Sequence, residues 1–356
     1  MRTPVRAADA SGFVLVTVLA MLVILTILAA TIGAITQRVR DDQLERQRQL
    51  QDEIAMASTR ASVLYLLTSQ RMTFGGLTVD EKVAFAQDEQ EDSDENPFSN
   101  MPVGNEIALD SRPYLGMGGV DFALQDDRGL LAVNWTAPAL LERFLALDKP
   151  LPVPIETLQN LLLDYQDVDD LYRLNSAERN QYEQAERPPP SNHTLATPME
   201  LRRIIGWDKA LAGIDAITLN DSLTVSRNPV ININTAPARV LQSLPGVDAD
   251  MAARAVASRV LQPFINFTAF YQLLGAVPTD PDGLSMYPAQ SGTLKLWSPQ
   301  GGAVQVLHWT LTPLDDGGRP WREDYEFTLP QDSQLVAGTA VATAAKVLAQ
   351  PLPAPQ

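Results

Sequence analysis

A single apolar run dominates the N-terminal part of the chain. Residues 13–35 contain no charged side chain. At about 1.5 Å per helical residue, this length covers a hydrocarbon core of roughly 30 Å. A secretory signal peptide has a shorter apolar region of about 7–15 residues. The run therefore predicts a membrane-spanning helix.

The helical pattern continues past the apolar run. Residues 37–70 contain no Gly or Pro and are rich in Gln, Arg, Glu, Leu and Ala, which favour helices. Apolar residues recur every three or four positions at Leu50, Ile54, Ala57, Ala61, Leu64 and Tyr65. We expect one helix of about 55 residues, with its second half packed on a soluble domain. The alternative is a membrane anchor followed by an unrelated linker helix.

Strand patterns occur in two separated places. Residues 119–135 have two short apolar stretches around Asp-Asp-Arg-Gly, which predicts a hairpin or a strand–turn–strand. Residues 292–298, 303–312 and 321–329 alternate between turns that contain Gly, which predicts an antiparallel meander. Because too few strands stand on either side, we expect one sheet that is split in the sequence.

Helical periodicity fills the interval between the two strand regions. From residue 136 to about residue 288, apolar residues recur at helical spacing between Pro, Gly and Asp breaks. The tetrapeptide Thr-Ala-Pro-Ala occurs at 136–139 and 235–238, where each Thr is expected to cap a helix. This interval predicts an inserted helical domain. Outside it, the acidic stretch 80–95 predicts a solvated loop, and the C-terminal end predicts a mostly disordered tail with room for a short helix.

The amino-acid composition limits the kinds of partner and site that the chain can have. The net charge of −16 argues against a nucleic-acid partner, because phosphate binding needs clustered Lys and Arg. With no Cys, disulfides and thiolate sites are excluded, and His193 and His308 are the whole imidazole supply. No nucleophile or glycine-rich phosphate loop accompanies the carboxylates. We therefore expect neither an enzyme nor a small-molecule substrate.

One short segment concentrates carboxylates. Asp164, Asp167, Asp169 and Asp170 lie within seven residues and repel one another unless water or a cation separates them. Oxygen ligands at this density suit Ca²⁺, although aspartates that simply face water are common. The segment is not an EF-hand, because the Asp-x-Asp-x-Asp-Gly pattern with Glu at position twelve is missing.

The N-terminus resembles that of type IV pilin-like proteins. A short leader ends in Gly12, and the apolar run begins with Phe13. The resemblance implies that a prepilin peptidase cuts after Gly12 and that Phe13 becomes the first, methylated residue. Mature position five is then Thr17, where most members carry Glu. Among this class, the minor pseudopilin K of type II secretion systems commonly lacks that Glu.

Two internal segments strengthen the resemblance to the pseudopilin K family. Residues 231–236 read Ile-Asn-Ile-Asn-Thr-Ala and precede a helical pair, and residues 164–182 carry an Asp-rich motif followed by Ala177, Glu178 and Tyr182. Tyr165 stands where the family often has Trp, and a usual Gly-rich loop is replaced by residues 171–176. The resemblance implies calcium as a possible cofactor, with these ligands favoured: Asp167, Asp169, Asp170 and Glu178.

The resemblance implies an α+β fold. A pilin-like long N-terminal α-helix is expected to pack on a small antiparallel sheet, with a large all-α domain inserted between sheet strands. The expected parts are a leader (1–12), the N-terminal helix (13–71, transmembrane over 13–35), a pilin-like α/β domain (72–135 and 289–330), an insert with helix-hairpin-helix-like units (136–288) and a mostly disordered tail (331–356).

The expected role is structural. The resemblance implies a minor pseudopilin that caps the tip of the type II secretion pseudopilus and supports protein export across the outer membrane. It would be single-pass in the bacterial inner membrane with a periplasmic C-terminal domain, and its partners would be other minor pseudopilins and the prepilin peptidase. Two alternatives stay open at this stage: a membrane-anchored DNA-binding protein of competence type, and a minor pilin of an adhesive type IV system.

The competence alternative rests on residues 231–259, whose frame resembles a helix-hairpin-helix. In DNA-binding versions, the turn between the helices carries two Gly and its N–H groups contact a phosphate. Here Asp248 replaces the second Gly. Arg239, Arg254 and Arg259 keep the segment mildly basic, so charge alone does not decide the point.

Overall fold

The computed structural model describes residues 11–79, 100–275, 283–314, 318–331 and 340–350. Most of the leader and the whole acidic stretch 80–95 lie outside the described residues. The chain forms two compact units, Met1–Ile54 and Ala55–Gln356. Helix α1 (Ser11–Ser69) is common to both, so one long helix follows the leader, as the sequence predicts.

The first unit contains the apolar part of α1 and the polar turns that follow it as far as Ile54. Its most apolar 18-residue window has a mean hydropathy of 2.8, and none of that window is buried. The helix is therefore long and apolar enough to cross a membrane. Thr26, Thr31 and Thr36 donate their hydroxyl hydrogens to carbonyls three or four residues earlier, which satisfies these polar groups inside the helix.

The second unit contains a split antiparallel sheet. Strands β3 (Tyr114–Leu115), β4 (Asp121–Asp126), β9 (Ser291–Trp297), β10 (Ala303–Leu311) and β11 (Trp321–Pro330) are ordered β11-β10-β9-β4-β3. Strand β4 pairs with β9 across more than 160 positions of sequence, and β9 to β11 form a meander. The predicted α+β fold is confirmed, with helices inserted between the strands of one sheet.

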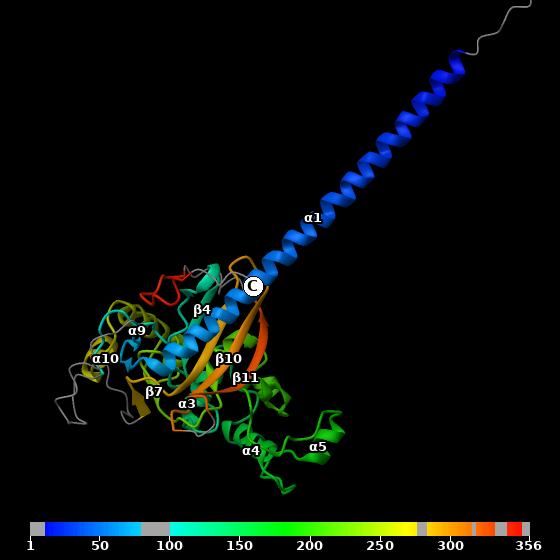
Figure 1. Ribbon diagram of the computed structural model, residues 1–356. Helices are drawn as coiled ribbons and strands as arrows, with labels where there is room; N and C mark the ends of the chain where they lie inside the picture. The colour runs from blue at the N-terminus through cyan, green and yellow to red at the C-terminus, as the bar shows by residue number, and fades with distance from the viewer. Residues whose placement is uncertain (1–10, 80–99, 276–282, 315–317, 332–339, 351–356) are drawn as a thin grey trace, which may run out of the picture. The chain divides into compact units, whose positions relative to one another are not determined.

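The end of α1 packs on one face of this sheet (Figure 1). Side chains alternate between the two faces, so Phe122 and Leu124 contact the α1 side while Ala123 lies on the other. The buried residues of the helix are Ala55, Met56, Thr59, Val63, Leu64, Leu66 and Leu67. Leu50 and Tyr65 of the expected stripe are exposed, and so are Ala57 and Ala61. Of the predicted face only Leu64 is buried, and the observed face includes Thr59, so the prediction is wrong in its rotation about the helix axis.

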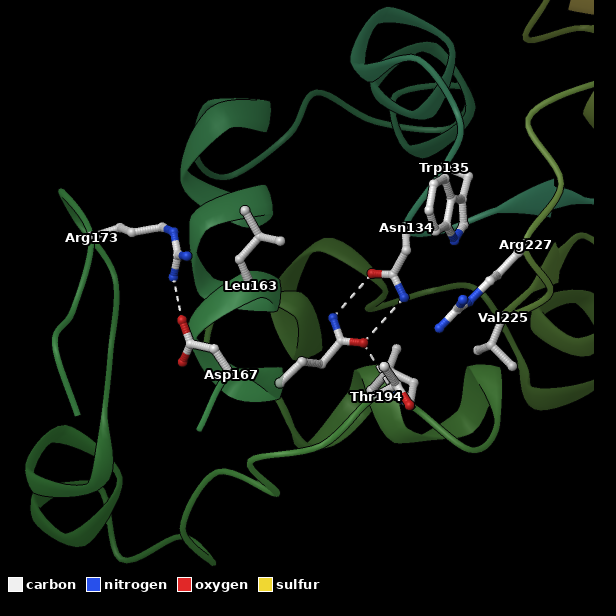
Figure 2. Close-up of a pocket in the computed structure, with 10 residues that line it drawn as sticks. Asn134, Trp135, Leu163, Asp167, Arg173, Thr194, Val225 and Arg227 are labelled. Atoms are coloured by element: carbon white, nitrogen blue, oxygen red, sulfur yellow. Dashed lines mark hydrogen bonds and ion pairs between the residues drawn. The ribbon is translucent and has the colours of Figure 1, made fainter. Parts of the chain in front are cut away.

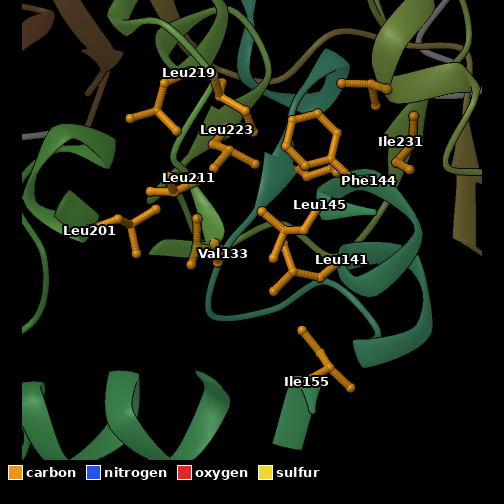
Figure 3. Close-up of a cluster of buried hydrophobic side chains, with 14 of the residues drawn as sticks. Val133, Leu141, Phe144, Leu145, Ile155, Leu201, Leu211, Leu219, Leu223 and Ile231 are labelled. Atoms are coloured by element: carbon orange, nitrogen blue, oxygen red, sulfur yellow. The ribbon is translucent and has the colours of Figure 1, made fainter. Parts of the chain in front are cut away.

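Short helices build the inserted domain. They are α3 (Pro138–Leu145), α4 (Ile155–Gln166), α5 (Arg179–Gln184), η4 (Pro198–Arg203), α6 (Trp207–Ala210), α7 (Ala216–Asn220), α8 (Ala238–Leu241), α9 (Ala249–Leu261) and α10 (Phe267–Leu274). Their apolar faces share one core, part of which Figure 3 shows. Neither Thr of the Thr-Ala-Pro-Ala repeat is a cap, since Ala137 and Pro237 occupy the capping positions of α3 and α8.

Two parallel strand pairs bring distant parts of the insert together. Strand β5 (Leu131–Ala132) pairs with β6 (Leu223–Thr224), and β7 (Ile231–Asn232) pairs with β8 (Leu284–Ser285). Of the two arrangements expected around Asp-Asp-Arg-Gly, the hairpin is wrong because β5 pairs with β6, and the strand–turn–strand is confirmed by the succession of β4, the 3₁₀ turn η3 (Asp127–Gly129) and β5. The chain leaves the sheet after η3. As a result Leu131 and Val133 lie in the core of the insert, although the sequence assigns them to the pilin-like part.

The C-terminal end also differs from its prediction. Residues 340–350 lie in the expected disordered tail and form no helix. Val341 makes a parallel bridge to Tyr114 of β3, and Ala345 and Leu348 are buried in the core beneath α1. The Leu115 N–H donates to the Val341 carbonyl over 3.0 Å, and the Val341 N–H donates to the Pro113 carbonyl over 3.1 Å, so this segment pairs backbone groups at the β3 edge.

Candidate functional site

Three carboxylates meet where α4 ends and α5 begins. Asp164 lies in the last turn of α4, Asp167 is its C-cap, and Glu178 is the N-cap of α5. Asp164 and Glu178 are buried and Asp167 is half-buried. One oxygen of each lies within 4.8 Å of an oxygen of the others. We call these three residues the acidic cluster.

Arg173 neutralises two of the three. Its Nη1 donates to Asp164 Oδ1 and, over 2.7 Å, to Asp167 Oδ2. Its backbone N–H donates to Asp164 Oδ2 over 2.7 Å. Both oxygens of Asp164 are thus satisfied by one residue of the connecting loop.

Glu178 has no such support. Its side chain faces the Gln181 backbone in a capping-box arrangement, but the Gln181 N–H donates to the main-chain carbonyl of Glu178 over 2.9 Å. Neither carboxylate oxygen of Glu178 therefore has a hydrogen-bond partner among the described residues, and the same is true of Asp167 Oδ1. Burial, followed by the charges of Asp164, Asp167, Asp170 and Asp169, raises the pKa of Glu178 to about 7. Buried carboxylate oxygens without donors are the arrangement that a bound cation would relieve.

The structure gathers only part of the predicted ligand set. Asp167 and Glu178 lie in the acidic cluster, while Asp169 and Asp170 are exposed. Asp169 Oδ1 accepts a hydrogen bond from the Leu171 N–H over 2.9 Å, which is a local turn contact. Buried Asp164 completes the cluster in their place. The spacing could have shown this, because positions 164 and 167 are about one helical turn apart at the C-terminal end of α4.

A groove of about 380 Å³ lies beside the cluster (Figure 2). Asp167 and Arg173 form one part of its lining, and Trp135 and Arg227 form another. Two amide hydrogen bonds cross it, from Asn134 Nδ2 to Gln166 Oε1 over 3.1 Å and from Gln166 Nε2 to Asn134 Oδ1 over 3.0 Å. Trp135 is 50% exposed, so the groove wall has an accessible aromatic face.

A second group of carboxylates lies between the sheet and the insert. Asp126 is fully buried at the end of β4. Its Oδ1 accepts from the N–H groups of Arg128 and Ala289 at 3.1 and 2.7 Å. Its Oδ2 accepts from Asn232 Nδ2 and Thr235 Oγ1 at 2.9 and 2.8 Å. Burial raises the pKa of Asp126 to about 6 despite these four hydrogen bonds.

Asp127, its neighbour, pairs with His308. His308 Nε2 is 3.0 Å from Asp127 Oδ2, and Nδ1 is 2.8 Å from Asp324 Oδ2. Burial opposes the charged imidazole, but the charge of Asp127 and hydrogen bonds to both carboxylates raise the pKa of His308 to about 9. His308 lies within the alternating pattern of residues 303–312, and nothing in that pattern indicates this pairing. Asp126, Asp127 and His308 form what we call the junction.

The Asn-x-Asn-Thr motif connects the insert to the junction through hydrogen bonds. Asn232 and Thr235 hold Asp126, while Asn234 Nδ2 donates to the carbonyl of Phe264 over 2.9 Å. Arg259 is buried and donates through Nη1 to the carbonyls of Ile233 and Ala236. The motif that carries the family resemblance is therefore a structural connection.

The helix-hairpin-helix-like segment, residues 231–259, has few groups that could bind a phosphate. The Asp248 side chain caps α9 by accepting from the Met251 N–H over 2.7 Å, so a carboxylate stands at the helix N-terminus. Arg239 pairs with Asp148, and buried Arg259 faces the protein interior. Of the three arginines in this segment, only Arg254 is exposed.

The residues expected to act in processing belong to α1. Gly12 and Phe13 have helical backbone, and Thr17 is exposed four positions after Phe13. They lie in the first unit, apart in sequence from both carboxylate groups.

Residues 231–285 match the family model described as type II secretion system (T2SS), protein K. This match confirms the resemblance that the sequence predicts. No curated protein matches the chain. Among solved structures, a chain from the crystal structure of the GspK-GspI-GspJ complex from the enterotoxigenic Escherichia coli type 2 secretion system is similar. It is 16% identical, with 83% of this chain and 100% of that chain covered and a TM-score of 0.45.

Proposed function

We propose that the chain, whose residues 231–285 match the model of type II secretion protein K, is a structural minor pseudopilin at the tip of the secretion pseudopilus. The match over residues 231–285 carries the proposal. An exposed apolar helix in the first unit supports it, because such a surface is stable in lipid or against other apolar helices. In this role the chain supports protein export and performs no catalysis.

Thr17 supplies a physical reason for the tip position. A carboxylate at mature position five would compensate the N-terminal amine of the subunit ahead, because an unpaired charge in an apolar filament core is costly. Thr17 has no carboxylate to offer. A subunit with none ahead of it needs no such group, and the inserted domain would hinder addition beyond it.

The proposal includes processing and location. A prepilin peptidase would remove residues 1–12, and Phe13 would become the methylated N-terminus. Helix α1 would then anchor the chain in the bacterial inner membrane as a single span, with the second unit in the periplasm. Other minor pseudopilins would be its partners in a tip complex.

Processing and assembly can be tested together. The full chain is expressed with a prepilin peptidase and three candidate minor pseudopilins, and its mature N-terminus is determined by sequencing. We expect Phe13 and co-purification of the other subunits. A Gly12→Val variant should remain uncut while still inserting into the membrane. An intact Met1, or a cut near residue 34, in the wild-type chain would contradict the proposal.

A divalent cation, Ca²⁺, also fits the acidic cluster. Asp164, Asp167 and Glu178 would hold it, and the unsatisfied oxygens of Glu178 and Asp167 support this choice. The ion would neutralise the cluster and join α4 to α5, which stabilises the insert. Asp169 and Asp170 of the predicted set are exposed and would act on the ion only as more distant, solvent-screened charges.

A further inference from the structure

We propose that Arg173 is an internal substitute for the divalent cation, so that a cation enters the acidic cluster only by displacing the guanidinium group. The proposal rests on the calcium site proposed above and concerns the residue that sets its affinity. In addition to the three carboxylates that would be ligands, the site would contain Arg173 as a competitor of the cation.

The position of one nitrogen is the main support. Arg173 Nη1 contacts both Asp164 Oδ1 and Asp167 Oδ2, so a single positive group bridges two carboxylates. A cation shared by the cluster would have to bridge the same two residues, because they are two of its three possible ligands. The guanidinium and the ion therefore compete for the same oxygens.

The guanidinium group of Arg173 replaces a cation only in part, because it does not satisfy Glu178. Arg173 makes no hydrogen bond to Glu178, whose two oxygens lack any partner among the described residues. A guanidinium presents donors in one plane, whereas Ca²⁺ accepts oxygen ligands from all directions. The cluster thus holds one carboxylate more than Arg173 can satisfy, which favours exchange for a divalent ion.

Arg173 can leave at small cost. Its side chain is 41% exposed, while the side chain of Asp164 is 0% exposed. Figure 2 shows the guanidinium beside Asp167 at the groove, which has room for a displaced side chain. The adjacent loop residues Leu171 and Leu174 are 79% and 80% exposed, so moving the loop would disrupt little packing. The N–H of Arg173 can keep its bond to Asp164 throughout.

Competition makes a quantitative prediction. The full chain in detergent is freed of metal with a chelator and titrated with Ca²⁺ by calorimetry. Arg173→Gln removes the competing charge, and we expect its Kd for Ca²⁺ to fall at least about tenfold, which corresponds to about 1.4 kcal/mol. Arg179→Gln is the matched control, because Arg179 follows Glu178 directly and makes no ion pair among the described residues. We expect its Kd to stay within about twofold of wild type.

Stability provides a second readout. Without metal, Arg173→Gln should unfold at a lower temperature than wild type, because Asp164 loses its counter-ion. Saturating Ca²⁺ should abolish that difference. If Arg173→Gln fails to fold, Arg173→Lys keeps a positive charge and should bind Ca²⁺ with nearly wild-type affinity. A tenfold tighter Kd for Arg173→Lys would overturn the proposal, since the competing charge would still be present.

The outcomes separate this proposal from the calcium site itself. Suppose that wild type binds Ca²⁺, that Glu178→Gln abolishes this binding, and that Arg173→Gln binds with the same Kd as Arg179→Gln. The calcium site is then supported, and the proposed competition by Arg173 is overturned. Weaker binding by Arg173→Gln would also overturn it, because Arg173 would then be a positioning residue. If neither wild type nor Arg173→Gln binds at millimolar Ca²⁺, both proposals fail.

Discussion

The junction and the acidic cluster contain the same kind of residue in opposite states. In the junction, each oxygen of Asp126 accepts two hydrogen bonds, and Asp127 contacts Thr224, Ser291 and His308. In the cluster, both oxygens of Glu178 lack a partner among the described residues. Asp126 and Glu178 are both buried, with exposed fractions of 0% and 3%. The supply of donors therefore decides which carboxylates hold the fold together and which are left for a ligand.

The largest effect is expected at Asp126. Asp126→Ala leaves the side chains of Asn232 and Thr235 and two backbone N–H groups without their acceptor. We expect a loss of about 3 kcal/mol or more in the free energy of unfolding, measured with urea. Asp126→Asn, which keeps one acceptor oxygen, should cost less. Glu183→Ala on the exposed side of α5 serves as the control. An Asp126→Ala variant as stable as that control would show that the junction is dispensable.

The pH dependence of stability should show how much charged His308 stabilises the folded chain. Its pKa in the folded chain is about 9, above the ordinary value of 6.5. The stabilisation by charged His308 is therefore fully present below pH 6.5 and is lost as the pH rises through about 9. We expect wild type to lose about 2 kcal/mol relative to His308→Gln between pH 6 and pH 10. Urea unfolding at several pH values measures this difference, and parallel curves for the two proteins would rule it out.

Glu178 should respond in the opposite sense to Asp126. At pH 8 without metal, Glu178→Gln replaces a buried carboxylate that has no donor by a neutral amide. We expect the free energy of unfolding to change little or to rise by up to about 1 kcal/mol. Thermal unfolding in a chelator tests this. A loss as large as that of Asp126→Ala would mean that the Glu178 carboxylate is already satisfied without a cation.

The sequence predicted the parts of the fold that depend on local pattern. The meander of β9 to β11 follows from alternation and glycine turns, and the long helix follows from composition. The sequence predicted the wrong buried face of α1, because it counted only apolar positions and Thr59 is polar but buried. Its Oγ1 accepts from the Met117 N–H over 2.9 Å, and Gly116 packs so closely on Thr59 that a side chain at position 116 would clash with it.

The candidate site was predictable only in part. The density of Asp residues pointed to the α4–α5 connection, but Asp169 and Asp170 are exposed while Asp164 is buried. The junction was missed altogether, because His308 and Asp127 are 181 positions apart and meet only after the sheet has formed. Nothing in the local pattern of either residue records that contact.

Calcium binding by the full chain is the most direct test of the difference between the two carboxylate groups. Wild type, Glu178→Gln, Asp126→Asn and Asp170→Asn are titrated with Ca²⁺ by calorimetry at pH 7.5 after removal of metal. We predict one Ca²⁺ per chain for wild type and a Kd at least about tenfold higher for Glu178→Gln, with nearly unchanged affinity for Asp126→Asn and Asp170→Asn. Unchanged affinity in Glu178→Gln, or loss of binding in Asp126→Asn, would contradict the assignment of the cluster as the cation site.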